Sequence, residues 1–127
     1  MIKTLVLPAY NEEKYIGDIV NRSKNYVDRV IVVDNCSTDK TFSEAKKAGA
    51  ITLKHCVNLG KGASLKTGCD AAINIGTDII ALMDSDGQHK PEDLPEFFDA
   101  LDFEKVNMVI GCRISRNKMP LIRSFGT

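Results

Sequence analysis

Three common signatures of function are absent from this sequence. Its 17 basic and 17 acidic residues balance to a net charge of zero, so it has no basic footprint of a nucleic-acid-binding protein. It contains no run of about 18 apolar residues that could form a membrane-spanning helix. The first residues, MIKTLVLPAYN, become polar too soon for a secretory signal peptide. We therefore expect a cytoplasmic protein that does not bind nucleic acid.

Cysteines are few and widely spaced. Cys36, Cys56, Cys69 and Cys112 form no Cys-x-x-Cys pair, which leaves no spacing typical of a zinc site. Their density is also too low for a secreted disulfide scaffold. We expect them to be free thiols in a reducing compartment.

Hydrophobic residues are plentiful, at 43% of 127 residues, which is enough for one domain with its own core. Their periodicity switches repeatedly between strand-like and helix-like patterns. Strands are predicted over residues 2–8, 28–34, 51–55, 77–84 and 106–112, and helices over 12–26, 37–50, 61–76 and 91–103. The third of these helices, over residues 61–76, is expected to present Leu65, Cys69, Ala72 and Ile73 on one face.

This alternation predicts an α/β domain with a mainly parallel sheet and flanking helices. The segment DRVIVVD is β-branched and apolar on both faces, as a central parallel strand should be. The tail over residues 113–127 is basic, has no clear periodicity and shows no closing element. It looks like the start of a further part of the fold.

Polar loops follow each of the first four predicted strands: PAYNEE, DNCSTD, NLGKG and DSDGQH. In open parallel sheets, ligands bind outside the carboxyl ends of the strands. Any one of these segments could be an ordinary polar loop with cap residues. Four of them at one edge indicate a ligand site.

The segment DSDGQH carries the most specific chemistry. Asp84 and Asp86 are two residues apart after an apolar strand, so in an extended segment both carboxylates can face one ion. Oxygen ligands favour Mg²⁺ or Mn²⁺ over zinc, and Gln88 adds a neutral oxygen. The alternative is a capped turn before Pro91. His89 is expected to be a loop residue rather than a ligand.

Two other loops carry weaker signals. Lys61 lies between Gly60 and Gly62 at a predicted helix start, where backbone N–H groups and the helix dipole attract phosphate; the pattern is not a Walker loop, and a plain glycine turn is the alternative. Asp34 ends an apolar strand, where an acid commonly holds a ribose. An Asx turn leading into the next helix explains Asp34 equally well.

Taken together, the segments LPAYNEE, VIVVDNCSTDKT, NLGKGASLKTG, ALMDSDGQHKPEDLPEF and VIGCR resemble the blocks of the family 2 inverting glycosyltransferases, in the family's order and spacing. The resemblance covers nearly the whole chain and is greatest to the dolichol-phosphate mannosyltransferase and polyprenyl-phosphate glycosyltransferase branch. It implies a Rossmann-like GT-A fold, a nucleotide diphosphate sugar as donor, and Mg²⁺ or Mn²⁺ as cofactor.

The resemblance also implies roles for individual residues. Three groups are implied, for the donor, the metal and the acceptor phosphate, with Asp86 and Arg113 as the catalytic residues. The donor group is Pro8, Ala9, Tyr10, Glu12, Asp34, Lys61, Gly62 and Asp84; the metal group is Asp84, Asp86 and Gln88; the acceptor group is Arg113, Arg123 and Thr127.

Three departures from the family pattern stand out. Asn35 takes the place of a common second acid, and Ser85 takes the place of a frequent alanine. Family catalytic domains usually have roughly another hundred residues. We therefore expect residues 1–127 to form a single N-terminal, nucleotide-sugar-binding part of a GT-A domain, truncated at its C-terminal side.

The predicted function is transfer of a sugar from GDP-mannose or a UDP-sugar to an acceptor, most naturally a polyprenyl or dolichyl phosphate. Such an acceptor would bring the protein to the cytoplasmic face of a membrane as a peripheral protein. The main alternative is a non-catalytic nucleotide-binding or interaction fragment, in which self-association covers apolar surface and gives a homo-oligomer.

Two other enzyme classes are disfavoured. A haloacid-dehalogenase-type phosphotransferase carries its Asp-x-Asp after the first strand rather than the fourth. A nucleotidyltransferase usually has a glycine-rich first loop, and LPAYNEE contains no glycine.

Overall fold

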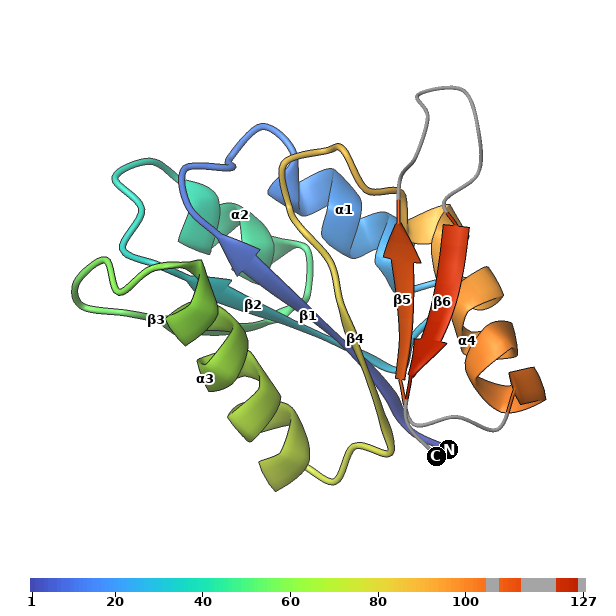
Figure 1. Ribbon diagram of the computed structural model, residues 1–127. Coiled ribbons are helices and arrows are strands. Elements are labelled where there is room, and N and C mark those ends of the chain that lie inside the picture. Colours follow the sequence, from blue (N-terminus) through green and yellow to red (C-terminus); the bar gives the residue numbers. More distant parts are fainter. Residues whose placement is uncertain (105–107, 113–120, 126–127) are drawn as a thin grey trace. The chain divides into compact units, whose positions relative to one another are not determined.

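The computed structural model describes residues 1–104, 108–112 and 121–125, and the chain divides into two compact units, Met1–Glu92 and Asp93–Thr127. The first unit holds a four-stranded parallel sheet in the order β3-β2-β1-β4 (Figure 1). Its strands are β1 (Lys3–Ala9), β2 (Arg29–Asp34), β3 (Ile51–Lys54) and β4 (Ile79–Leu82).

The connecting helices cover both faces of this sheet. They are α1 (Ile16–Ser23), α2 (Thr41–Lys47) and α3 (Lys61–Asn74). The chain passes from β1 outward to β2 and β3, then returns to place β4 on the other side of β1. Because such crossovers are right-handed, this reversal puts α3 on the face opposite α1 and α2, as Figure 1 shows. The order therefore reverses at β1, which creates a switch point beside its carboxyl end.

The core lies against both faces of β1 and β2. Leu5, Val6, Leu7, Val32 and Val33 are fully buried, because central parallel strands are covered on both sides. The predicted fold class, an α/β Rossmann-like sheet with flanking helices, is confirmed.

Helix α3 packs closely on the sheet through small residues. Its buried stripe is Ser64, Gly68 and Ala72, which recur at the four-residue interval of one helix face. A Cβ atom at Gly68 would lie only 2.3 Å from Val6 Cγ1. The predicted face is therefore partly wrong, because Ile73 is 63% exposed; the smallest side chains, rather than the most apolar ones, meet the sheet.

The observed elements of the first unit are mostly shorter than predicted. Helix α1 begins at Ile16 rather than residue 12, because the Glu12 carbonyl accepts the Tyr15 and Ile16 amides in a separate turn. Helix α2 begins at Thr41, after a loop over residues 37–40 that contacts the loop following β1. Strand β4 ends at Leu82, so the two aspartates that follow it lie in a loop rather than on an extended strand.

The second unit contains α4 (Leu94–Glu104), β5 (Met108–Cys112) and β6 (Leu121–Phe125), and a short 3₁₀ turn (η1, Pro91–Asp93) precedes α4. The predicted fifth strand exists, but it pairs antiparallel with β6 in a separate two-stranded sheet, with Met108 opposite Phe125. Strand β6 has no periodicity in sequence from which it could be predicted. Among the described residues, no helix is long and apolar enough to cross a membrane.

Candidate donor-binding site

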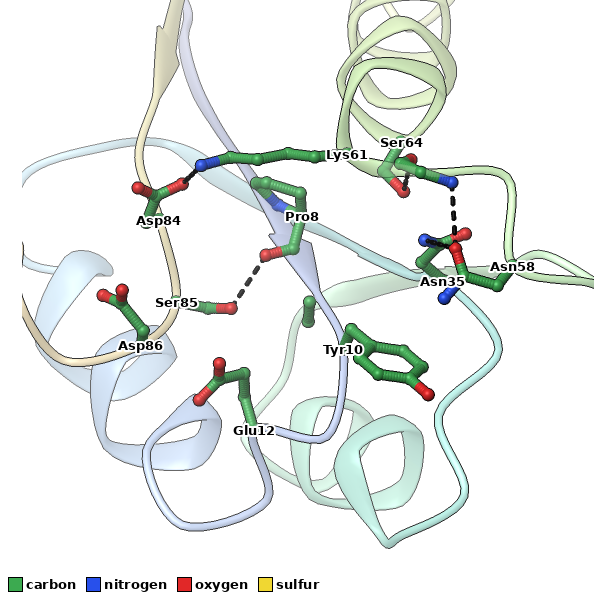
Figure 2. Close-up of a pocket in the computed structure, with 12 residues that line it drawn as sticks. Pro8, Tyr10, Glu12, Asn35, Asn58, Lys61, Ser64, Asp84, Ser85 and Asp86 are labelled. Carbon is green, nitrogen blue, oxygen red and sulfur yellow. Dashed lines mark hydrogen bonds and ion pairs between the residues drawn. The ribbon is translucent and has the colours of Figure 1, made fainter.

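A pocket of about 400 Å³ opens at the carboxyl end of β1, at the switch point of the sheet. Its walls come from the loops that follow β1, β2, β3 and β4, and from the first turn of α3 (Figure 2). The four polar loops singled out in the sequence therefore do meet. The pocket is lined by Pro8, Ala9, Tyr10, Glu12, Asn35, Asn58, Gly60, Lys61, Ser64, Asp84, Ser85 and Asp86.

Most residues predicted to bind the donor or the metal line this pocket. Asp34, Gly62 and Gln88 do not line it. Arg123 lies in β6, in the other unit. Arg113 and Thr127 lie outside the described residues. The pocket thus contains the proposed donor side, and the acceptor side stays a prediction.

Lys61 reaches across the pocket to Asp84. Its Nζ forms an ion pair with Asp84 Oδ1, and Figure 2 shows the lysine chain passing beside Pro8 to reach the carboxylate. The lysine side chain is 60% exposed, so the pair is open to solvent and contributes little to folding stability. Its main consequence is local: an exposed cation faces a carboxylate at the mouth of the pocket.

The loop after β4 is held by its own backbone and by β1. The backbone N–H of Gln88 donates to Asp86 Oδ1 at 2.9 Å, and the Ser85 hydroxyl donates to the Pro8 carbonyl at 2.8 Å. The Asp84 amide donates to His89 Nδ1 at 3.2 Å. His89 thus lies in the turn, in keeping with its prediction as a loop residue. The serine in place of a common alanine ties this loop to β1.

Negative charge accumulates on one side of the pocket. Burial raises the pKa of the Glu12 carboxyl, and the nearby charges of Asp86, Asp39 and Asp84 raise this pKa further. Figure 2 shows Glu12, Asp84 and Asp86 along the same side. Like charges gathered in this way favour either a proton or a cation between them.

This charge accumulation predicts a pH-dependent effect of Glu12→Gln. Because the folded-state pKa of Glu12 is raised, the wild-type carboxyl favours folding fully below its unfolded pKa, and this contribution is lost as pH rises through the folded value. The variant should therefore melt at a higher temperature than wild type near pH 7. The difference should shrink as pH falls toward 4.5, the ordinary pKa of a glutamate. Thermal melts from about pH 4 to 8 measure it, and a constant difference across this range would contradict the electrostatic cause.

The first two loops are braced against each other. Asn11 has a φ of 52°. Its backbone N–H donates to Ser37 Oγ at 2.9 Å, and its side-chain Oδ1 accepts the Thr38 backbone N–H at 2.9 Å. The Glu12 amide donates to the buried Thr41 hydroxyl at 2.9 Å. These bonds fix the backbone at Glu12, whose side chain lines the pocket.

Asp34 lies beneath the site rather than in its wall. It is 1% exposed, and its Oδ1 accepts hydrogen bonds from the amide of Ser37, at 3.1 Å, and from the hydroxyl of the same residue. Asp34 thus makes a local bond within the loop that leads toward α2, as the alternative to a ribose contact expected, although the bond reaches three residues on rather than the two of an Asx turn. Contact of Asp34 with a nucleoside stays a prediction.

Five lining residues were not predicted as site residues: Asn35, Asn58, Gly60, Ser64 and Ser85. Asn35 and Asn58 belong to loops that the sequence did single out, but nothing in the pattern indicated that their amides turn toward the pocket. Ser64 lies one helical turn beyond Gly60, and its hydroxyl donates to the Gly60 carbonyl at 3.2 Å.

The oxygen donors of this site suit a hard divalent cation. Carboxylates of Asp84 and Asp86 with an amide oxygen from Gln88 are ligands that Mg²⁺ and Mn²⁺ accept. In the part of the chain that the structure describes, no three His, Cys, Asp or Glu side chains converge in a ready-made metal cluster. Mg²⁺ usually keeps several waters and binds through one or two carboxylates together with the phosphates of a substrate.

A parallel sheet with a charged pocket at its switch point is the arrangement in which open α/β proteins bind their ligands. The chain belongs to glycosyl transferase family 2, whose model matches residues 4–126. The resemblance stated from the sequence is therefore confirmed.

Named relatives and solved structures refine this placement. The chain is 34% identical, over 144 aligned positions, to a UDP-N-acetylglucosamine–dolichyl-phosphate N-acetylglucosaminyltransferase of Methanococcus voltae, covering 96% of this chain and 57% of that protein. A second similarity is to glucosyl-3-phosphoglycerate synthase from Mycobacterium tuberculosis, in a crystal structure with Mn²⁺, UDP and glucosyl-3-phosphoglycerate. The two chains share 29% sequence identity, and their structures give a TM-score of 0.65 over 79% of this chain and 39% of that one.

A third similarity concerns the fold alone. The structure of S. aureus TarS residues 1–349 with UDP gives a TM-score of 0.71 at 22% identity, over 93% of this chain and 37% of that chain. The chain spans about half the length of several curated relatives that it matches.

Proposed function

We propose that this chain forms the donor-binding part of a metal-dependent inverting glycosyltransferase that transfers a sugar from a nucleotide diphosphate sugar to a polyprenyl or dolichyl phosphate. The observation that carries the proposal is the switch-point pocket, which brings Glu12, Asp84 and Asp86 together with Lys61. The relative that acts on dolichyl phosphate supports the choice of acceptor.

The residues present fit a divalent cation. Asp86, with Asp84 and Gln88, would hold Mg²⁺ or Mn²⁺. Burial and the surrounding carboxylates raise the pKa of Glu12, which reflects the negative charge that a metal would offset. The bound metal would also offset the charge that develops on the leaving nucleoside diphosphate. A structural relative that contains both Mn²⁺ and UDP supports this assignment.

The start of α3 is suited to a diphosphate. Lys61 carries an exposed positive charge at the pocket, and the first backbone N–H groups of a helix attract phosphate. A Cβ atom at Gly60 or Gly62 would meet nothing within 4 Å, so a ligand could approach the bare backbone there. Tyr10 also lines the pocket, is 46% exposed and offers a ring face to a base or sugar.

We assign the acceptor side to Arg113, Arg123 and Thr127. A lipid phosphate is already anionic, so it can attack the anomeric carbon without a general base, and inversion follows when it attacks from the face opposite the leaving group. Arginine forks bind phosphate bidentately, which suits Arg113 and Arg123. Such an acceptor would place the protein at the cytoplasmic face of a membrane. A homo-oligomer stays a prediction.

Calorimetric titration tests the donor assignment. UDP-N-acetylglucosamine, UDP-glucose and GDP-mannose are each titrated into the protein with and without Mn²⁺. We expect one of them to bind only when the metal is present, because its diphosphate would otherwise face uncompensated carboxylates. Equal binding with and without metal would overturn the metal assignment, and binding of no donor would overturn the proposed function.

Turnover separates an enzyme from a non-catalytic nucleotide-binding fragment. The protein is incubated with the donor that binds, Mn²⁺ and a short-chain polyprenyl phosphate in detergent. Formation of the glycosyl lipid with release of the nucleoside diphosphate supports the transferase. Donor binding without a glycosyl lipid would favour the fragment.

A further inference from the structure

A chain of hydrogen bonds runs beneath the pocket from β2 to the start of α3. Its centre is Asn35, which is 5% exposed and directly follows β2. Asn35 Oδ1 accepts the Leu59 amide at 2.9 Å and lies 3.0 Å from His55 Nδ1. Asn35 Nδ2 donates to Asn58 Oδ1 at 2.8 Å. One amide thus contacts three residues between β3 and α3.

Two backbone amides fix the direction of the bonds that the Asn35 and Asn58 side chains make with each other and with His55 Nδ1. A backbone N–H can only donate, so the Leu59 amide requires the oxygen of Asn35 to face it. His55 Nδ1 meets the same oxygen and must therefore carry a proton. The Gly60 amide, 3.0 Å from Asn58 Oδ1, orients the second side-chain amide in the same way. The network is therefore fully satisfied in only one arrangement.

The other end of the imidazole reaches α3. His55 Nε2 lies 2.9 Å from Thr67 Oγ1, and a hydroxyl can donate to this nitrogen or accept from it. The ring thus connects the end of β3 to the second turn of the helix that begins with Lys61.

We infer that Asn35 is a positioning residue for the donor site. With His55 and Asn58 it forms a clamp that orders the turn over residues 58–60. This turn determines where α3 starts. Gly60, at φ 92°, redirects the chain into the helix, and the next residue, Lys61, is thereby held across the pocket from Asp84. The role of the clamp in binding rests on the proposed function; the ordering of the turn does not.

Aspartate, which has nearly the same shape, cannot replace Asn35 in this clamp. A carboxylate can still accept from Leu59 and His55, but it has no proton to donate to Asn58 Oδ1. Two oxygen acceptors would then face each other at the 2.8 Å separation. If the Asn58 amide rotated to relieve this repulsion, the Gly60 amide would lose its acceptor. The clamp therefore needs an amide at position 35.

The test combines Asn35→Asp with Lys61→Ala and the double variant, and uses Cys56→Ser as a control from the same loop. UDP with Mn²⁺ is the probe. We expect Asn35→Asp to raise the Kd for UDP about tenfold, which corresponds to about 1.4 kcal/mol. Because Asn35 acts through Lys61, the double variant should bind no more weakly than Lys61→Ala alone. Cys56→Ser, whose side chain is exposed, should bind like wild type.

Amide hydrogen exchange measured by NMR provides a readout that needs no ligand. In Asn35→Asp the Leu59 and Gly60 amides should exchange at least about tenfold faster, while amides of β1 and β2 keep their protection. Unchanged exchange at both amides, or additive losses of UDP affinity in the double variant, would overturn the inference. If wild type binds no UDP, the proposed function fails and the exchange rates alone decide whether the clamp exists.

Discussion

Replacement of Asp86 by asparagine is expected to weaken Mn²⁺-dependent binding of the nucleotide diphosphate sugar by at least about a hundredfold. Loss of even an outer partner of a metal ligand typically costs about 10- to 100-fold in affinity, and Asp86 is proposed to be a direct ligand. The change is otherwise conservative. Asp86 Oδ1 now accepts the backbone N–H of Gln88 at 2.9 Å, and the side-chain oxygen of the asparagine could still accept it. The loop after β4 should therefore keep its conformation while the site loses one negative charge.

A matched control removes the same charge elsewhere. Asp70 lies on α3, is 57% exposed, pairs with Lys66 and does not line the pocket. Asp70→Asn should leave both the affinity and its dependence on Mn²⁺ unchanged. Calorimetry of the three proteins with and without metal measures the effect. If Asp86→Asn still binds the donor as wild type does with Mn²⁺, Asp86 is not a ligand and the metal must lie elsewhere.

The location of the site could be predicted from the sequence because parallel strands share one carboxyl edge. The apolar runs that end at Pro8 and near Asp84 are typical of buried strands. The loops that follow them were therefore expected to meet at this edge of the sheet. The details depended on contacts that no local pattern encodes. Asp84 turns to Lys61 of a distant loop, and Asp34 turns down to Ser37 instead of into the pocket.

Element boundaries were predicted less well, and for a consistent reason. Residues 12–15 and 37–40 have helical neighbours, but their backbone and side-chain groups bond across the two loops instead of along a helix, as the Thr41 hydroxyl bond to the Glu12 amide shows. Such contacts between distant loops override local helix preference. Strand β6 could not be predicted because its residues show no clear periodicity, and its partner, β5, was predicted as one more strand of the parallel sheet.

The buried face of helix α3 was also predicted only in part, because it is formed by its smallest residues. This close packing leads to the second large prediction: Gly68→Ala should lower the free energy of unfolding by about 2 kcal/mol. The added methyl would lie 2.3 Å from Val6 Cγ1 and 3.2 Å from Val33 Cγ2. Both valines are fully buried in the centre of the sheet, so neither can move aside easily. Overpacking of this kind costs about 1–3 kcal/mol, which outweighs the gain of up to about 1 kcal/mol from replacing glycine within a helix.

Gly17→Ala is the control, because Gly17 also lies in a helix, α1, and a Cβ atom there would meet nothing within 4 Å. It should leave stability unchanged or raise it by up to about 1 kcal/mol. Urea denaturation of the three proteins measures both changes. If Gly68→Ala is as stable as Gly17→Ala, the close approach of α3 to the sheet is not a feature of the native fold. If it is destabilised as expected, the small-residue stripe is what lets α3 pack this closely against the sheet.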